Sequence, residues 1–176
     1  LMKNNVNMSH LRIRALCEGA ILVALAFVLS FVKLYQLPNG GSLTPAMFPI
    51  LLFALRFGLG RGLLAGFVFG LLQMIFDGAY AWGWQSMLLD YSLAYMFVGF
   101  AGLLPLKKFN PAWGALLGCV ARFAVHYFSG ITIYAQYMPE RFMELTMTTP
   151  AIYSLLYNGS YMSVNTVLAI LVCALL

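Results

Sequence analysis

The sequence predicts an all-α integral membrane protein, a bundle of six transmembrane helices that forms a single membrane domain over residues 1–176. Hydrophobic residues make up 62% of the chain and charged residues 9%, whereas soluble domains carry about 25% charged residues. The mean hydropathy is +0.88. Because one bilayer-spanning helix takes about 20 apolar residues, a chain of this length supplies roughly six spans and no extramembrane domain.

Six apolar segments, bounded by proline, glycine and charged residues, are the expected spans. They lie near 15–35, 44–57, 61–77, 83–105, 111–136 and 150–175. The first follows a basic segment and is expected to be a retained helix, since the later spans make a cleaved leader unnecessary. The second and third are short and meet at Gly58-Leu59-Gly60, which predicts a tight turn with positive φ angles. The second is therefore not expected to cross the bilayer completely.

The fourth span, 83–105, follows an outer loop rich in aromatic residues. The fifth begins at Asn110-Pro111 and the sixth at Thr149-Pro150. Each pair is an N-cap residue followed by a proline, which fits the first position of a helix because its missing N–H would be unpaired there in any case. These two helix starts are the best defined in the sequence.

The basic residues predict that both chain ends are cytoplasmic. With six alternating spans, a cytoplasmic N-terminus leaves only Lys33 and Arg141 outside, and the inner side then holds Lys3, Arg12, Arg14, Arg56, Arg61, Lys107 and Lys108. This asymmetry follows the positive-inside rule. Since the basic residues stand in ones and twos at the ends of apolar runs, the net charge of +5 does not indicate a nucleic-acid partner.

Small residues recur on two of the expected helices. Gly58, Gly62, Gly66 and Gly70 are four apart and predict a flat stripe for close packing inside the bundle. Ala20 and Ala24 form a similar face on the first helix. Spacing alone favours internal packing for this face as well, with docking of a second membrane protein as the alternative.

Polar side chains inside the hydrocarbon are costly, so each one calls for a partner or a use. The candidates are Glu18, Asp90, Arg122, His126, Asn158 and Asn165. Arg122 and His126 are four residues apart and share a helix face, which Gly130 and Tyr134 extend toward the outer end. This face predicts one wall of a polar cavity. No metal site is expected, since the sequence shows no metal-ligand spacing.

Aromatic residues gather at the same depth from three segments. Asp90 is followed by Tyr91 and Tyr95, an outer loop carries Tyr80, Trp82 and Trp84, and the last span carries Tyr153, Tyr157 and Tyr161. An interfacial belt accounts for the tryptophans. A buried carboxylate surrounded by aromatic faces suits a flat organic cation, because Coulomb attraction and cation–π contacts both strengthen when water is excluded.

Four alternatives remain at this point. Asp90 could neutralise Arg122 in a structural ion pair, or serve as the proton site of an ion-coupled secondary carrier. An intramembrane enzyme could use Asp90 with His126, although no nucleophile elbow, HExxH or Walker motif accompanies them. A scaffold protein would use only the small-residue faces.

Over nearly its whole length, the chain resembles the thiamin-specific substrate-binding components of energy-coupling factor (ECF) transporters. The matching stretches are Glu18–Phe27, Phe48–Leu52, Arg56–Gly66, Leu89–Tyr91 and His126–Asn158. The resemblance implies a six-helix protein of the bacterial plasma membrane that captures thiamin from outside with high affinity. It also implies no enzymatic activity, no cofactor, and docking on a transmembrane coupling subunit that is driven by two ABC ATPases. A related pyrimidine or another vitamin is the alternative ligand.

The resemblance also implies site residues. Asp90 stands where the family usually has a glutamate that contacts the aminopyrimidine, and its shorter side chain has to reach further. His126 and Tyr134 match the pair that sandwiches the pyrimidine, with Tyr134 in place of a tryptophan. The other matching contacts are Tyr80, Tyr91, Tyr153 and Asn158, and the match for the docking motif is Ala20 with Ala24. The Gly-rich first outer loop, 36–44, is expected to close over the ligand, and its own contacts stay unassigned.

Overall fold

The computed structural model describes residues 2–37, 40–77 and 83–175, most of which are helical. The helices are α1 (Met2–Ser30), α2 (Phe48–Phe57), α3 (Leu59–Asp77), the fourth helix made of α4 (Trp84–Ser86), η4 (Met87–Leu93), α5 (Ala94–Val98) and η5 (Gly99–Leu103), then α6 (Pro111–Thr132) and α7 (Pro150–Ala174). Among the described residues, five helices are long and apolar enough to cross a bilayer. The chain is a multi-pass membrane protein, as predicted.

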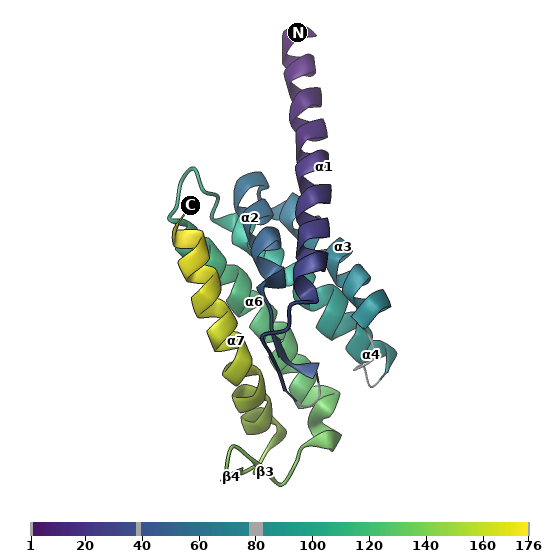
Figure 1. The fold of residues 1–176 in the computed structure, drawn as a ribbon, viewed down its shortest axis with the longest axis vertical. Coiled ribbons are helices and arrows are strands. Elements are labelled where there is room, and N and C mark those ends of the chain that lie inside the picture. Colours follow the sequence, from purple (N-terminus) through teal and green to yellow (C-terminus); the bar gives the residue numbers. More distant parts are fainter. Residues whose placement is uncertain (1, 38–39, 78–82, 176) are drawn as a thin grey trace.

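The remaining elements are short and connect the helices. A hairpin of β1 (Tyr35–Gln36) and β2 (Ser42–Leu43), then the turn η2 (Pro45–Met47), join α1 to α2. The turn η6 (Tyr134–Tyr137) and a second hairpin of β3 (Arg141–Phe142) and β4 (Leu145–Thr146) join α6 to α7. Figure 1 shows that the second hairpin lies at the end of the bundle opposite to both chain termini.

Both predicted N-caps form. The side chain of Asn110 accepts the N–H of Ala112 at 2.9 Å, and Oγ1 of Thr149 accepts the N–H of Ile152 at 3.3 Å. Each cap satisfies one of the amides that the first turn of a helix leaves unpaired. The local sequence thus fixes where α6 and α7 begin.

The second helix is short, as predicted, and lies in the middle of the bundle. Its ten residues span about 15 Å, half the thickness of the hydrocarbon core. Ile50, Leu51, Ala54 and Leu55 are fully buried there. The helix ends at Gly58, whose φ of 86° is a conformation that glycine adopts without steric cost. This turn reverses the chain directly into α3.

The glycine stripe of α3 packs closely against the fourth helix, so its predicted role in packing inside the bundle is confirmed. A Cβ added to Gly66 would lie 2.2 Å from the carbonyl oxygen of Tyr95, and one added to Gly70 would lie 2.5 Å from that of Tyr91. Gly62 approaches the carbonyl of Gly99 in the same way. Backbone therefore meets backbone along this contact, with no room for a side chain.

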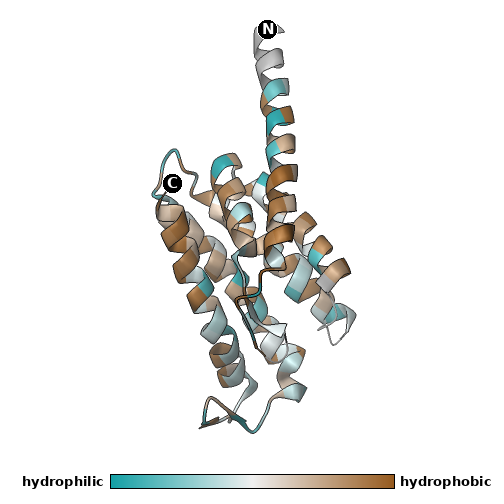
Figure 2. Cartoon of the chain, viewed as in Figure 1, coloured by the Kyte–Doolittle hydropathy of each residue, from teal (hydrophilic) through white to brown (hydrophobic). Residues whose placement is uncertain are grey.

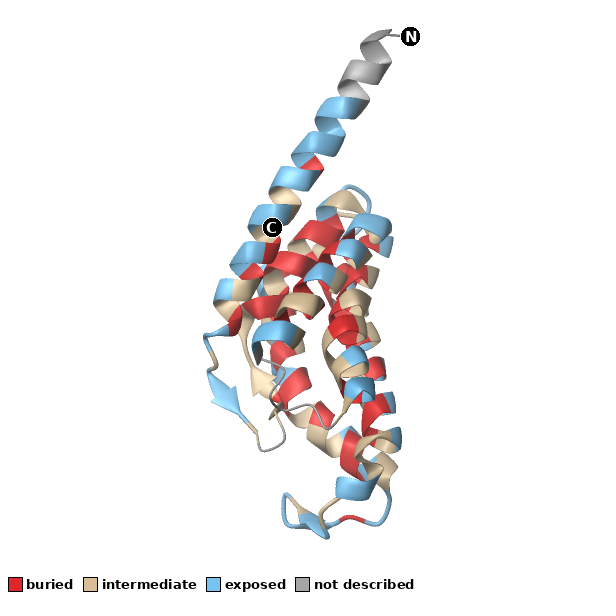
Figure 3. Cartoon of the chain, turned by 90° about the vertical axis from the view of Figure 1, so that its right-hand side faces the viewer, coloured by how far each residue is buried: buried red, intermediate tan, exposed pale blue. Residues whose placement is uncertain are grey.

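Helix α1 stands apart from the rest of the bundle over its N-terminal half, and both chain termini lie at the same end of the molecule (Figure 1). Its middle section is strongly apolar (Figure 2) and much of its surface is exposed (Figure 3). Ala15 and Gly19 face the bundle, where a Cβ on Gly19 would meet the ring of Phe53 at 3.0 Å. Ala20 and Ala24 are exposed. The preference for internal packing, which rested on spacing alone, is therefore wrong for these two alanines, and docking of a partner stays a prediction.

The fourth helix departs from the expected regular span because Met87–Leu93 forms a π-helix. A π-helical turn inserts extra backbone and rotates the side chains that follow it, and such insertions are frequent at functional sites. Trp84 lies just before it and is 71% exposed, as an interfacial aromatic residue would be. Tyr80 and Trp82 lie outside the described residues.

Candidate functional site

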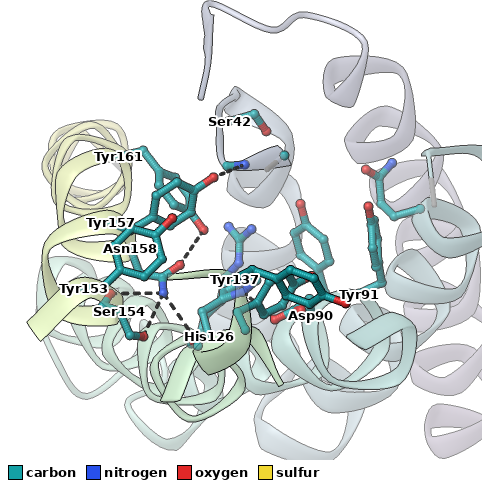
Figure 4. Close-up of a pocket in the computed structure, with 17 residues that line it drawn as sticks. Ser42, Asp90, Tyr91, His126, Tyr137, Tyr153, Ser154, Tyr157, Asn158 and Tyr161 are labelled. Carbon is teal, nitrogen blue, oxygen red and sulfur yellow. Dashed lines mark hydrogen bonds and ion pairs between the residues drawn. The ribbon is translucent and has the colours of Figure 1, made fainter. Parts of the chain in front are cut away.

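A polar cavity opens at the end of the bundle that lies away from the chain termini. It encloses about 910 Å³ of space, part of which lies at its open mouth. Its walls come mainly from the first hairpin, the π-helix, α6 with the turn that follows it, and α7, with one residue each from α3 and α5. Figure 4 shows these side chains converging on one space.

The structure brings seven of the eight predicted ligand-site residues to this cavity. They are Asp90, Tyr91, His126, Gly130, Tyr134, Tyr153 and Asn158. The eighth, Tyr80, lies outside the described residues. Side chains that are up to 68 residues apart in sequence, such as Asp90 and Asn158, thus share one site.

Asp90 makes two contacts with α6. Its Oδ1 lies 3.0 Å from Nδ1 of His126, and its Oδ2 accepts a hydrogen bond from Oγ of Ser129, also at 3.0 Å. The two side chains of the Asp90–His126 pair are only 14% and 11% exposed. The carboxylate is therefore held from both sides in a largely buried position.

Asp90 and Arg122 do not form the ion pair that was one of the alternatives. Within the described part of the chain, Arg122 instead lies over the ring of Tyr95, with its Cζ 4.3 Å from the ring centre, and one terminal nitrogen donates to Sδ of Met47 at 3.6 Å. Its Nε is buried and has no partner among the described residues. Because the guanidinium uses an aromatic face and a sulfur, the carboxylate stays available to the cavity.

His126 presents one free ring nitrogen. A carboxylate can only accept, so a neutral imidazole carries its proton on Nδ1, which faces Asp90. Nε2 is then an acceptor, and it is buried without a partner among the described residues. A buried polar atom without a partner is unusual in proteins and suits a ligand that donates a hydrogen bond.

Asn158 ties α7 to α6 behind the cavity. Its Nδ2 donates to the carbonyl of His126 at 3.3 Å and to that of Ser154 at 3.1 Å, while its Oδ1 accepts the hydroxyl of Tyr161 at 3.2 Å (Figure 4). Gly130 permits this close approach, because a Cβ there would lie 2.1 Å from Oγ of Ser154. The amide is thus largely satisfied by the protein and sets the shape of the wall.

Three tyrosines of α7 line the opposite wall. The ring centres of Tyr153 and Tyr157 are 5.7 Å apart, and those of Tyr157 and Tyr161 are 6.0 Å apart. Across the mouth, burial and the nearby Asp90 carboxylate raise the pKa of Tyr134, so its phenol stays a neutral donor at physiological pH. The cavity therefore combines one carboxylate with several aromatic faces, an arrangement suited to a flat cation.

The first hairpin covers part of the cavity and is anchored to α7. The N–H of Gly41 donates to the hydroxyl of Tyr157 at 3.0 Å, and Nδ2 of Asn165 donates to the carbonyl of Ser42 at 3.1 Å. A Cβ on Gly41 would lie only 2.8 Å from the Tyr161 ring. Closure of this loop over a ligand stays a prediction.

Several lining residues were not named as ligand contacts from the sequence, although Tyr95, Arg122, Tyr157 and Tyr161 belong to the polar face and the aromatic cluster predicted there. They are Gly40, Gly41, Ser42, Gln73, Tyr95, Arg122, Tyr137, Ser154, Tyr157 and Tyr161. Tyr157 and Tyr161 follow Tyr153 at four-residue intervals, so a helix-face argument extended from Tyr153 finds them. Gln73 belongs to α3 and bonds Oγ of Ser30 at 2.8 Å, and no sequence signal places it here.

Comparisons with known proteins place this geometry in a family. Residues 16–176 match the family model described as thiamine transporter protein (Thia_YuaJ). The thiamine transporter ThiT of Bacillus subtilis is 30% identical, over 92% of this chain and 88% of its own, and that of Lacticaseibacillus paracasei is 28% identical, over 95% and 88%. The solved structure of ThiT from Listeria monocytogenes superimposes with a TM-score of 0.80 at 25% identity and covers 93% of both chains. The chain belongs to the thiamine transporter family.

Proposed function

We propose that this protein is the thiamin-binding component of an ECF-type vitamin importer and captures thiamin in the polar cavity. The observation that carries the proposal is a largely buried carboxylate, Asp90, among aromatic side chains in a cavity that opens at one end of a membrane bundle. Thiamin joins a flat aminopyrimidine to a positively charged thiazolium, so it offers both a hydrogen-bond donor and a cation. Family membership and the two curated relatives support the same ligand.

Each polar group has a role in this proposal. The Asp90 carboxylate faces the aminopyrimidine, as the resemblance implies, and its charge also attracts the thiazolium, while Nε2 of His126 accepts from the exocyclic amine. The ring of Tyr134 stacks on the pyrimidine, while Tyr91, Tyr153 and Tyr80 supply further aromatic or hydroxyl contacts. Asn158 and Gly130 hold the wall in place. Both oxygens of Asp90 already contact side chains of α6. Because aspartate is shorter than the glutamate usual in the family, Asp90 contacts the ligand partly through His126, which it orients.

Titration calorimetry on the purified protein tests the ligand. We expect saturable binding of thiamin with one site per chain, and weaker binding of the isolated hydroxymethyl aminopyrimidine, which lacks the cation. Mass spectrometry of small molecules that co-purify with the protein checks the ligand independently. Tighter binding of the pyrimidine fragment than of thiamin would assign the site to that related ligand, and turnover of either compound would favour an enzyme.

We also propose that Ala20 and Ala24 form the docking face for the transmembrane coupling subunit, which two ABC ATPases drive. Both alanines lie on the exposed side of α1, next to the exposed apolar residues Leu16, Ile21 and Val28. Small residues let a second helix approach closely, and in lipid such packing is a main source of helix association. The face is also remote from the cavity, whose lining contains no residue of α1 among those described.

Tryptophan substitutions separate docking from capture. Ala24→Trp is expected to leave thiamin affinity unchanged and to abolish co-purification with the coupling subunit and the ATPases. Leu25→Trp is the matched control, because Leu25 is also exposed but lies about 100° around α1 from Ala24. Equal loss of assembly in both variants would mean that any bulky residue on α1 blocks docking, and the alanine face would not be specific.

A further inference from the structure

A second cavity lies at the opposite end of the bundle, between α1, the α2–α3 turn and the connection from η5 to α6. It encloses about 1,300 Å³ including the space at its mouth. Five basic side chains line it, namely Arg12, Arg14, Arg56, Arg61 and Lys107. None of them belongs to the thiamin site. This cavity is called the basic cleft below.

The basic cleft has an uncompensated positive charge. The acidic side chain bound to these residues is Glu18, which pairs with Nε of Arg14 at 2.6 Å and with Arg56 at 3.2 Å. Glu18 therefore joins the α1 side of the cleft to the α2 side and offsets one of the five charges. No ion pair within the described residues neutralises Arg12, Arg61 or Lys107. The cleft thus offers several exposed cationic groups to a negatively charged occupant.

Two of the guanidinium groups are held in place by one aromatic ring. The Cζ atoms of Arg56 and Arg61 lie 5.7 and 5.9 Å from the centre of the Phe57 ring. Cation–π contact of this kind restricts a long side chain that would otherwise sample many rotamers. Positive groups fixed in this way can bind a phosphate without a large ordering cost.

The remaining wall is apolar. Leu11 of α1, Leu55 of α2 and Leu106 of the connection line the same cavity. The backbone N–H of Leu106 is bonded to the carbonyl of Leu55 at 3.1 Å, so this wall is a fixed part of the fold. A site for a free inorganic anion has no need of such a wall, whereas an amphipathic molecule uses both surfaces.

The depth of the cleft matches the boundary between hydrocarbon and headgroups. Its residues lie where the apolar spans begin or end, at Ser9–Ser30, Leu59–Phe76, Trp84–Leu103 and Pro111–Thr132. This end also holds the basic excess that predicts the cytoplasmic side. The cytoplasmic leaflet carries anionic lipids, and basic pockets between transmembrane helices on that side bind their headgroups.

We propose that the basic cleft is a binding site for one anionic phospholipid of the cytoplasmic leaflet. The lipid phosphate lies among Arg12, Arg61 and Lys107, and the start of an acyl chain lies on the leucine wall. Such a lipid would fill the space between α1 and the α2–α3 turn. The proposal is independent of the thiamin site, because no residue lines both cavities.

Native mass spectrometry of the full chain tests the proposal. The protein is purified in detergent with phosphatidylglycerol or with zwitterionic phosphatidylcholine, and retained lipid is counted per chain. We expect one phosphatidylglycerol to be retained in preference to phosphatidylcholine. Arg61→Gln is expected to lower that retention roughly fivefold, because one basic side chain near an anionic lipid surface contributes about that factor to binding. Lys108→Gln is the matched control, because Lys108 is exposed at the same end and does not line the cleft.

Each outcome decides the question. Selective loss with Arg61→Gln and no loss with Lys108→Gln supports a built site. Equal loss in both variants overturns it in favour of general attraction between a basic surface and anionic lipid. Displacement of the lipid by soluble glycerophosphate at matched concentration would remove any role for the apolar wall and overturn the lipid assignment. Unchanged thiamin affinity in both variants confirms that they are folded.

Discussion

Replacing Asp90 by asparagine keeps the shape of the side chain and removes its negative charge, so this variant isolates the electrostatic part of ligand capture. Asparagine can still accept a hydrogen bond from Ser129, which now bonds Oδ2 at 3.0 Å. With an effective dielectric constant of about 20, a unit charge attracts a ligand cation 5 to 8 Å away by roughly 2 to 3 kcal/mol. Thiamin affinity is therefore expected to fall by about 30- to 150-fold.

Two comparisons make this prediction specific. Ser129→Ala keeps the charge and removes one hydrogen bond from Asp90, so it should cost only about 1 kcal/mol, or roughly fivefold in affinity. The neutral aminopyrimidine fragment lacks the thiazolium, so Asp90→Asn should weaken its binding far less than that of thiamin. Calorimetry with both ligands, together with the melting temperature of each variant, supplies the measurements. Unchanged thiamin affinity in a folded Asp90→Asn protein would refute the electrostatic reasoning.

Three further predictions concern packing and hydrogen bonding. Gly66→Ala should lower the free energy of unfolding by about 1 to 3 kcal/mol because the new methyl group meets a backbone carbonyl. Gly60→Ala on the same helix should leave the free energy of unfolding unchanged, because the space around Gly60 is open. Thermal unfolding of both variants in detergent measures the difference. Gly41→Val should weaken thiamin binding at least tenfold by displacing Tyr157 from the cavity wall, and a variant with wild-type affinity would show that the hairpin adapts. His126→Phe keeps an aromatic face and loses the ring nitrogens, so a loss of about 1 to 3 kcal/mol in calorimetry would measure their contribution.

The sequence predicted those parts of the fold that depend on local chemistry. Asn110 and Thr149 start their helices because an N-cap followed by proline satisfies the first turn in any context. Gly58 turns the chain because other residues rarely adopt its φ. The polar residues that line the cavity were predicted for a similar reason, since a charged or amide side chain within an apolar span is costly unless it is used.

What could not be predicted depends on contacts between distant segments. The π-helix at Met87–Leu93 follows from no residue pattern, yet it brings both Asp90 and Tyr91 to the cavity. Gly41 joins the site because the first hairpin folds back onto α7. The hydrogen bond between Gly41 and Tyr157 connects residues that are 116 positions apart in the sequence. The partner of Arg122 was also open, because spacing cannot distinguish a carboxylate from the ring of Tyr95.

The glycine contact between α3 and the fourth helix divides the molecule into a rigid half and an adaptable half. Since main chain touches main chain at Gly62, Gly66 and Gly70, no side chain there can change rotamer, and these two helices move only as one body. The first hairpin and the tyrosines of α7 are joined by side-chain hydrogen bonds, which can break and re-form. Any movement that accompanies entry or release of thiamin is therefore expected in that second half, with the helix bearing Asp90 as the fixed reference.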